Sequence, residues 1–182
     1  MQRPGIITLV LSGSLFVAAN AEGQFSRTGT PSVVFTAAGP AGMKIEGKTG
    51  ELDVTESNSS VKVSVKLAGL DTGIALRNKH MREKYLETDK FPTADLVVDR
   101  ASLQSPQDGS DAAASAQAQI TIHGQTKPVT IRYQAHRTGK AYDVQGTTHV
   151  NMNDFGISVP SYLGVTVKPD VDIAVRFSML DS

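Results

Sequence analysis

The sequence predicts an all-β chain with one short helical insert. Through most of its length apolar and polar residues alternate with period two, which is the pattern of strands that bury one face. Compact segments rich in Gly, Pro and polar residues interrupt this alternation. The segment from Leu70 to Pro92 departs from it, because its apolar residues recur at helical spacing among many charged ones.

The N-terminal 21 residues have the features of a signal peptide. Arg3 and the α-amino group supply a short positive region, and a mostly apolar run extends from Ile6 to Ala19. Ala19-Asn20-Ala21 has the small-x-small pattern of a cleavage site. The run is shorter than the roughly 20 apolar residues that span a bilayer. We therefore expect cleavage near Ala21, a periplasmic or secreted protein, and one domain over residues 22–182 with no membrane span.

Several segments of that domain alternate as strands do. The clearest begins at Val61, where apolar residues at every second position up to Leu67 are separated by Lys and Ser. In chain order the segments are 33–37, 43–47, 52–56, 61–67, 94–99, 113–122, 129–134, 142–152 and 171–179.

Short turns separate many of these segments, as at 39–42, 47–50, 124–128 and 138–140. Such connections favour antiparallel neighbours, because parallel strands require longer crossovers. Eight or so strands with one apolar face each leave two architectures open, a sandwich and a closed barrel. The inward residues are mostly Val, Ile and Thr, which would leave space for a cavity in a barrel or pack densely in a sandwich.

The insert is predicted to form a short helix from about Gly73 to Leu86. Its apolar residues at helical spacing allow one side to pack against the strands. These residues are Ile74, Met81 and Tyr85. We expect the side chain of Asp71 or Thr72 to cap the start of the helix. A helix between strands can lie over one end of a barrel.

Composition excludes several functional classes. The chain has 18 basic and 18 acidic residues, so it lacks the overall field that draws nucleic acid or an anionic membrane. It has no Cys, which excludes disulfides, thiolate catalysis and Cys-ligated metal. The four His residues show no metal-ligand spacing, and no nucleophile elbow is present. We therefore predict no metal site, no cofactor and no catalytic residue.

Three motifs carry a resemblance to a known family. The first is Thr72-Gly73, Arg77, His80-Met81, Tyr85-Leu86 and Phe91-Pro92; the second is Ile120 to Gly124 followed by Thr126 to Val129; the third is Asn153 to Ile157. Together, over about Ser32 to Met179, they resemble the YceI family, also described as polyisoprenoid-binding and lipocalin-like. Asn78 departs from the family pattern, which often has Asp after the Arg.

This resemblance implies an eight-stranded antiparallel lipocalin-like β-barrel with an elongated apolar cavity. It also implies a non-enzymatic binding protein that carries or stores an isoprenoid or related amphiphilic lipid in that cavity. Nucleic acid is not an expected partner, and the formation of a homodimer is left open.

The candidate ligand contacts lie on the insert and on the barrel wall. Arg77 and His80 are three residues apart, so a helix places them side by side. There Arg can bind a phosphate or carbonyl oxygen, and His can donate or accept a hydrogen bond. The alternative is a structural role for both, with Asp154 as a partner of Arg77. The apolar candidates are Met81, Tyr85, Leu86, Phe91, Val63, Val65, Val175 and Phe177.

Two other functions remain open from the sequence. One is an enzyme that acts on a hydrophobic small molecule inside the same barrel, which would require a buried polar pair in the cavity. The other is a secreted stress-protection or interaction module whose barrel interior is filled by its own side chains.

Overall fold

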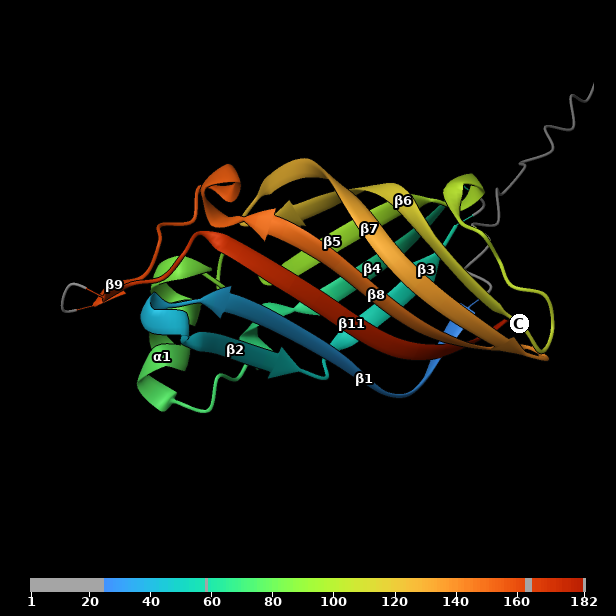
Figure 1. Cartoon of the computed structure of the whole chain (residues 1–182), viewed down its shortest axis with the longest axis horizontal. Coiled ribbons are helices and arrows are strands. Elements are labelled where there is room, and N and C mark those ends of the chain that lie inside the picture. Colours follow the sequence, from blue (N-terminus) through green and yellow to red (C-terminus); the bar gives the residue numbers. More distant parts are fainter. Residues whose placement is uncertain (1–24, 58, 163–164, 182) are drawn as a thin grey trace, which may run out of the picture.

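A nine-stranded antiparallel sheet that curls into a nearly closed barrel forms the body of the protein (Figure 1). The computed structural model describes residues 25–57, 59–162 and 165–181. The predicted signal peptide and its cleavage site lie outside these residues. Within them the fold is all-β with one short helix, as the sequence predicts.

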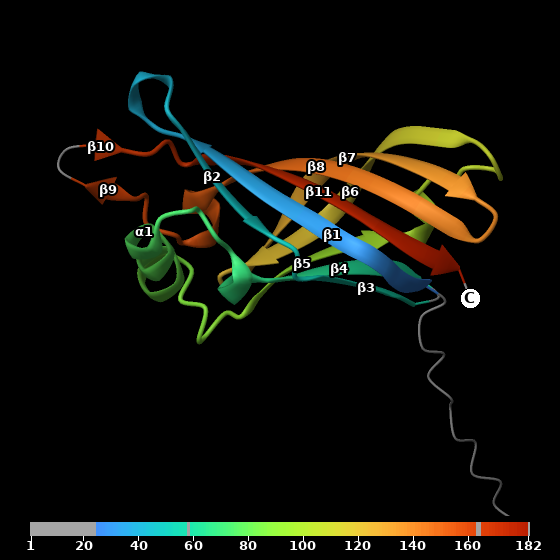
Figure 2. The ribbon, with the colours of Figure 1, turned by 90° about the horizontal axis from the view of Figure 1, so that it is seen from below.

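Nine strands make up the barrel sheet. They are β1 (Phe25–Ala38), β2 (Lys44–Thr49), β3 (Leu52–Glu56), β4 (Ser60–Lys66), β5 (Thr93–Asp99), β6 (Asp111–Ile122), β7 (Gln125–Thr138), β8 (Ala141–Asn151) and β11 (Asp170–Asp181). Their order across the sheet is β2-β1-β11-β8-β7-β6-β5-β4-β3, with every neighbouring pair antiparallel. A separate hairpin, β9 (Ser161–Tyr162) and β10 (Val165–Thr166), projects from the end of the barrel that carries the helix (Figure 2).

The strand count is nine where eight were predicted, because one position around the barrel is filled by two strands. Only Gly50 and Glu51 separate β2 from β3, and β2 pairs with β1 whereas β3 pairs with β4. Lys66 N–H donates to Glu51 O (3.0 Å), which extends the β3–β4 ladder toward β2. The two short strands therefore act together as the closing element of an eight-position barrel.

This closing element is held on both sides. The N-terminal part of β1 contacts β3, where Arg27 Nε lies 3.9 Å from a carboxylate oxygen of Asp53. The outer edge of β2 pairs with the chain that leads to the helix, since Lys48 and Asp71 exchange two backbone hydrogen bonds of 2.9 Å. Pairing an edge in this way removes unsatisfied backbone groups from it.

The helix α1 (Ala75–His80) runs directly into a π-helical turn, Met81–Tyr85, within the predicted range. The predicted cap is wrong: Ile74 occupies the N-cap position and makes no side-chain capping bond. Asp71 and Thr72 instead bind Asn78. Its amide nitrogen donates to Asp71 Oδ1 (2.6 Å), and its Oδ1 accepts from the Thr72 N–H (2.8 Å) and hydroxyl (2.6 Å).

These bonds explain why Asn suits position 78. An amide side chain can both donate and accept, whereas an ionised Asp accepts only. Asn78 can therefore donate to one carboxylate and accept from two donors at once. This one side chain therefore ties the loop before the helix to the helix itself.

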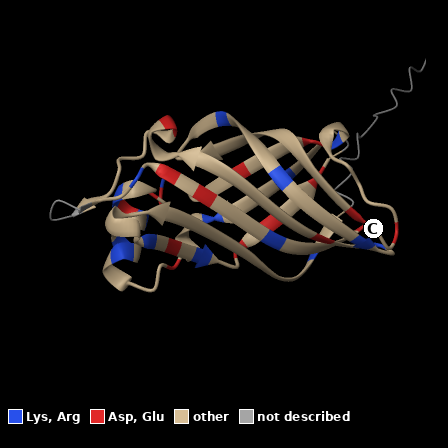
Figure 3. Ribbon diagram, in the orientation of Figure 1, with Lys and Arg blue, Asp and Glu red and all other residues tan. Residues whose placement is uncertain are grey.

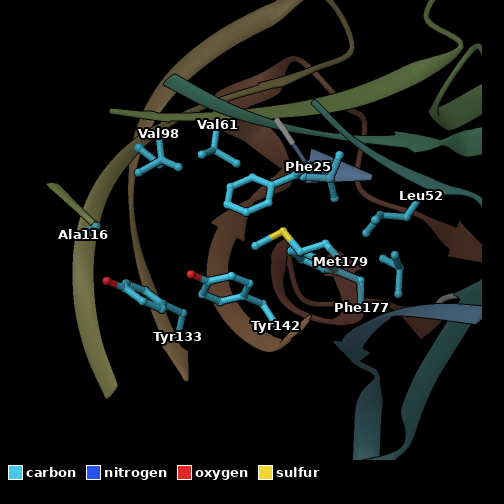
Figure 4. Packing of buried hydrophobic residues seen from close by; sticks show 12 residues of the cluster. Phe25, Leu52, Val61, Val98, Ala116, Tyr133, Tyr142, Phe177 and Met179 are labelled. Carbon is cyan, nitrogen blue, oxygen red and sulfur yellow. The ribbon is translucent and has the colours of Figure 1, made fainter. Parts of the chain in front are cut away.

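A cluster of buried apolar side chains fills the far end of the barrel from the helix. Phe25 and Tyr142 meet edge to face there, with ring centroids 5.7 Å apart, and Met179 lies between the strands that carry them (Figure 4). Leu52 of the closing element joins the same cluster and is 1% exposed. Packing at this end therefore depends on β3 being in place.

Leu52→Ala is expected to destabilise the protein by about 2–5 kcal/mol, because it leaves a cavity in the closing element. Chemical denaturation monitored by circular dichroism measures the change in the free energy of unfolding. Leu180→Ala is the matched control, since Leu180 is 40% exposed, and its cost should stay within about 0.5 kcal/mol. Equal losses in the free energy of unfolding for the two variants would contradict close packing of β3 against the far-end cluster.

Candidate functional site

An elongated cavity of about 840 Å³ occupies the barrel interior. Inward side chains from every barrel strand except β3 line it, and most are Val, Ile, Leu, Ala or aromatic residues. Small-molecule sites in proteins usually measure about 300–1,000 Å³. The cavity therefore has the size and the apolar character of a site for a hydrophobic molecule.

The burial of β11 follows the shape of this cavity. Its inward residues Phe177 and Met179 are buried in the far-end cluster, whereas Val171, Ile173 and Val175 on the same face are only half-buried. A strand whose inward face packed on other side chains would be buried along its whole length. The middle of β11 faces open space instead.

The helical insert lies across one end of this space, at the opening that we call the mouth. Three segments meet at this end and contribute to the lining: the insert Ile74–Leu86, the β1–β2 turn through Met43, and the chain beside the β9–β10 hairpin through Pro160 and Val167 (Figures 1 and 2). Met81 is the buried anchor of the insert, and it packs with Leu67 and Leu70. The insert thus contributes apolar and charged side chains to a cavity that is walled mainly by strands.

The structure places nine of the ten predicted ligand contacts in the cavity lining. These are Arg77, His80, Met81, Tyr85, Leu86, Val63, Val65, Val175 and Phe177. Phe91 is not part of the lining. Its ring packs edge to face on His123, with centroids 4.5 Å apart, and covers Gly124. A Cβ at Gly124 would come within 2.7 Å of that ring, so Gly124 makes room for Phe91.

Arg77 is held by Thr72. Its Nε donates to the Thr72 hydroxyl (2.8 Å), and its Nη2 donates to the Thr72 carbonyl (2.6 Å). The predicted pairing with Asp154 is wrong, because Asp154 lies exposed on a different turn, Met152–Phe155. Among the described residues Nη1 of Arg77 makes no hydrogen bond, so the guanidinium has a structural role and a free donor at the mouth.

Contacts of His123, which the sequence predictions did not include, hold the C-terminal end of the insert. We call them the His123–Glu87 clamp. Nε2 of His123 lies 3.0 Å from Glu87 Oε2, and Nδ1 lies 3.2 Å from the carbonyl oxygen of Phe155. Hydrogen bonds from Lys90 and then from His123 lower the pKa of the Glu87 carboxyl below its usual range. His123 lies within the second family motif, so the sequence could have indicated that it has a role.

The far end of the cavity carries an ion pair with a buried carboxylate, which the sequence predictions also missed. The Arg100 guanidinium binds the carboxylate of buried Glu56 and lies 5.2 Å from the centre of the Phe25 ring. Burial raises the pKa of Glu56, and the charge of Arg100 partly offsets this. Arg100 lines the cavity but Glu56 does not. Glu56 follows Leu52 and Val54 at the inward positions of β3, so the strand alternation could have predicted that this carboxylate is buried.

Two classes of site are absent from the described part of the chain. It contains no group of three or more His, Asp or Glu side chains that could hold a metal ion. None of its helices has the length and hydropathy needed to cross a bilayer.

Comparison with known sequences gives a family match and curated relatives. A family model described as a YceI-like domain matches residues 14–179. The chain is 35% identical over 127 residues to a UPF0312 protein of Pseudomonas putida, a match that covers 65% of this chain and 62% of that protein, less than two thirds of its length. A UPF0312 protein of Vibrio cholerae is 31% identical over 141 residues, covering 70% of this chain and 68% of that protein.

Solved structures share the fold. A polyisoprenoid binding domain from Saccharophagus degradans, implicated in plant cell wall breakdown, superposes with a TM-score of 0.74 at 16% identity, covering 87% of this chain and 99% of that one. BcnA of Burkholderia cenocepacia gives a TM-score of 0.64 at 17% identity, covering 81% and 95%. At these identities the likeness establishes the barrel architecture.

The His123–Glu87 clamp predicts a pH dependence of stability. Because the folded-state pKa of Glu87 is lowered from 4.5, its contribution is present above pH 4.5 and is lost as the pH falls through the lower folded value. Glu87→Gln should reduce Tm at neutral pH, and the gap from the parent protein should narrow at acid pH. Thermal melts across this range measure the gap. Glu83→Gln, an exposed change in the same insert, should produce no comparable gap.

Proposed function

The chain belongs to the family of YceI-like domains, and on this basis we propose that it binds an isoprenoid or a related amphiphilic lipid in its barrel cavity without enzymatic activity. The observation that carries the proposal is the apolar cavity of about 840 Å³, whose lining includes Arg77 and His80 at the mouth. The structurally similar domain of Saccharophagus degradans is a polyisoprenoid binding domain, which supports the same ligand class.

The cavity suits reversible exchange of such a ligand. Burial of each methylene-sized group contributes about 0.8 kcal/mol relative to water. A bilayer offers the ligand tail a similarly apolar environment, so transfer from membrane to cavity changes the hydrophobic free energy little. Affinity and selectivity then depend on cavity length and on the polar groups at the mouth. This balance suits a carrier or a store.

Two polar residues at the mouth are proposed contacts for the ligand's polar group. Arg77 lines the cavity and keeps one nitrogen outside its bonds to Thr72, and His80 lines the cavity one helical turn further along. A guanidinium in this position can bind a phosphate or carbonyl oxygen. The ligand tail would extend past Val63 and Val175 toward the far end.

The two alternatives fit the site less well. A stress-protection module with a filled core conflicts with the open middle of β11. An enzyme would need a buried polar pair in the cavity. Arg77 and His80 line the cavity but are not buried, and buried Glu56 lies outside the lining and is bound by Arg100. Export to the periplasm or beyond the cell, after cleavage near Ala21, is part of the proposal and rests on the N-terminal sequence pattern.

Filling the cavity should remove the ligand without unfolding the protein. Val175 faces the open space beside Gly146, whose lack of a side chain leaves room for a larger neighbour. Val175→Phe should therefore reduce co-purifying lipid by about tenfold. Extraction with organic solvent and mass spectrometry measure the released molecules. Val97→Phe is the matched control, because Val97 lies outside the cavity lining. Undiminished lipid in Val175→Phe would contradict a cavity ligand.

Arg77→Ala should separate the two roles of this residue. Loss of its bonds to Thr72 is expected to cost about 1–3 kcal/mol of stability, and loss of the mouth cation should reduce retention of lipids with an anionic group. Thr72→Val removes the hydroxyl acceptor and leaves the guanidinium, so it is the control for stability. If both variants lower Tm and retain equal lipid, the role of Arg77 is purely structural.

A further inference from the structure

The mouth of the barrel exposes large apolar side chains. Met43, Ile74 and Leu76 are 47%, 52% and 61% exposed, and all three also line the cavity. They come from two separate segments, the β1–β2 turn and the helical insert. An apolar rim that continues into an apolar cavity is unfavourable in water and indicates a contact surface.

Cationic residues accompany this rim. The segment Ala75–Tyr85 carries Arg77, Lys79, Arg82 and Lys84 but only one acidic residue, Glu83. The whole chain, by contrast, has equal numbers of acidic and basic residues. Figure 3 shows the blue segments of the insert at this end of the ribbon. Asp71 and Glu87 flank this segment and keep their negative charge, because the hydrogen bonds that they accept lower their pKa values. The charge of Glu87 is paired with Lys90, whose Nζ lies 2.6 Å from Glu87 Oε1.

We propose that this mouth surface, formed by Met43, Ile74 and Leu76 with Arg77, Lys79 and Lys84, docks on an anionic lipid bilayer; Arg82 is excluded, because its guanidinium is turned inward and donates to the Leu70 carbonyl oxygen. Apolar side chains would enter the headgroup region while lysine and arginine side chains contact lipid phosphates, as in other interfacial segments. The opening of the cavity would then face the bilayer. This inference rests on the proposed function, and it identifies a membrane as the direct source and acceptor of the ligand.

The geometry suits this docking mode. An amphiphile that leaves a bilayer for a distant cavity must expose its tail to water, at a cost of about 0.8 kcal/mol for each methylene-sized group. Contact between the rim and the bilayer removes that exposure during transfer. The attraction is local to one end, so it is compatible with a net charge of 0 and orients the mouth toward the surface.

Vesicle co-sedimentation of the purified protein tests the proposal. We expect binding to vesicles of phosphatidylcholine with phosphatidylglycerol, weaker binding to phosphatidylcholine alone, and a decrease with added salt. Leu76→Ser should weaken binding by roughly five- to tenfold, and Lys79→Glu by roughly tenfold or more, since each charge near an anionic surface contributes about a fivefold factor.

Matched controls lie at the far end of the barrel. Leu180→Ser changes an exposed leucine remote from the mouth, and Lys140→Glu reverses a charge in the β7–β8 turn. Both should bind vesicles as the parent protein does. Equal losses in the mouth and control variants would overturn the assignment of the surface. All proteins share the same N-terminal sequence, so a contribution from it is common to every comparison.

Lipid retention, measured by mass spectrometry on the same preparations, keeps the two proposals separate. Lys79 does not line the cavity, so Lys79→Glu should lose vesicle affinity while its co-purifying lipid is unchanged. Co-purifying lipid without binding to either vesicle would overturn docking and leave the proposed function standing. A dimer that Leu76→Ser dissociates, with no vesicle binding, would also overturn docking and assign the rim to a second copy of this chain.

Discussion

Closure of the antiparallel sheet is the constraint on which the rest of the structure depends. Once the sheet closes, every second side chain of each strand must point into one enclosed volume, whatever its size. Aromatic residues fill that volume at the far end, where Phe25, Tyr142 and Phe177 meet. Valine and isoleucine face the middle and do not reach across it. The cavity therefore follows from placing small β-branched residues on the inward face of a closed barrel.

Closure in turn depends on contacts at both ends of the closing element formed by β2 and β3. Leu52 anchors β3 in the far-end core, and the backbone bonds between Lys48 and Asp71 cover the edge of β2 at the mouth. Because Asp71 also binds Asn78, the same contacts that close the sheet position the helical insert. The His123–Glu87 clamp holds the other end of that insert. Barrel closure and the shape of the mouth are consequently coupled, and ligand entry is governed by elements that also stabilise the fold.

The differences between prediction and structure have a common physical cause. Phe91 follows the helical motif and is aromatic, so it was expected in the cavity, but the turn at Gly124 presents a flat surface that it covers instead. Asp154 was the partner considered for Arg77 under the structural alternative, yet the backbone and hydroxyl of Thr72 bind it instead. Each case depends on which groups the folded chain brings into contact, and alternation or helical spacing carries no information about such contacts.

The sequence by itself determined the class of strands, their approximate bounds, the helical insert and the family, because side-chain periodicity and local motifs report on local backbone structure. The strand segments it indicated correspond in order to β1 through β8 and β11. Only the tertiary structure decided between a sandwich and a barrel, divided the closing position between β2 and β3, and left the interior open. The tertiary structure also decided where charged and apolar side chains gather. The chain has no net charge, yet folding brings the insert and the β1–β2 turn to the same opening, where basic and apolar side chains lie together.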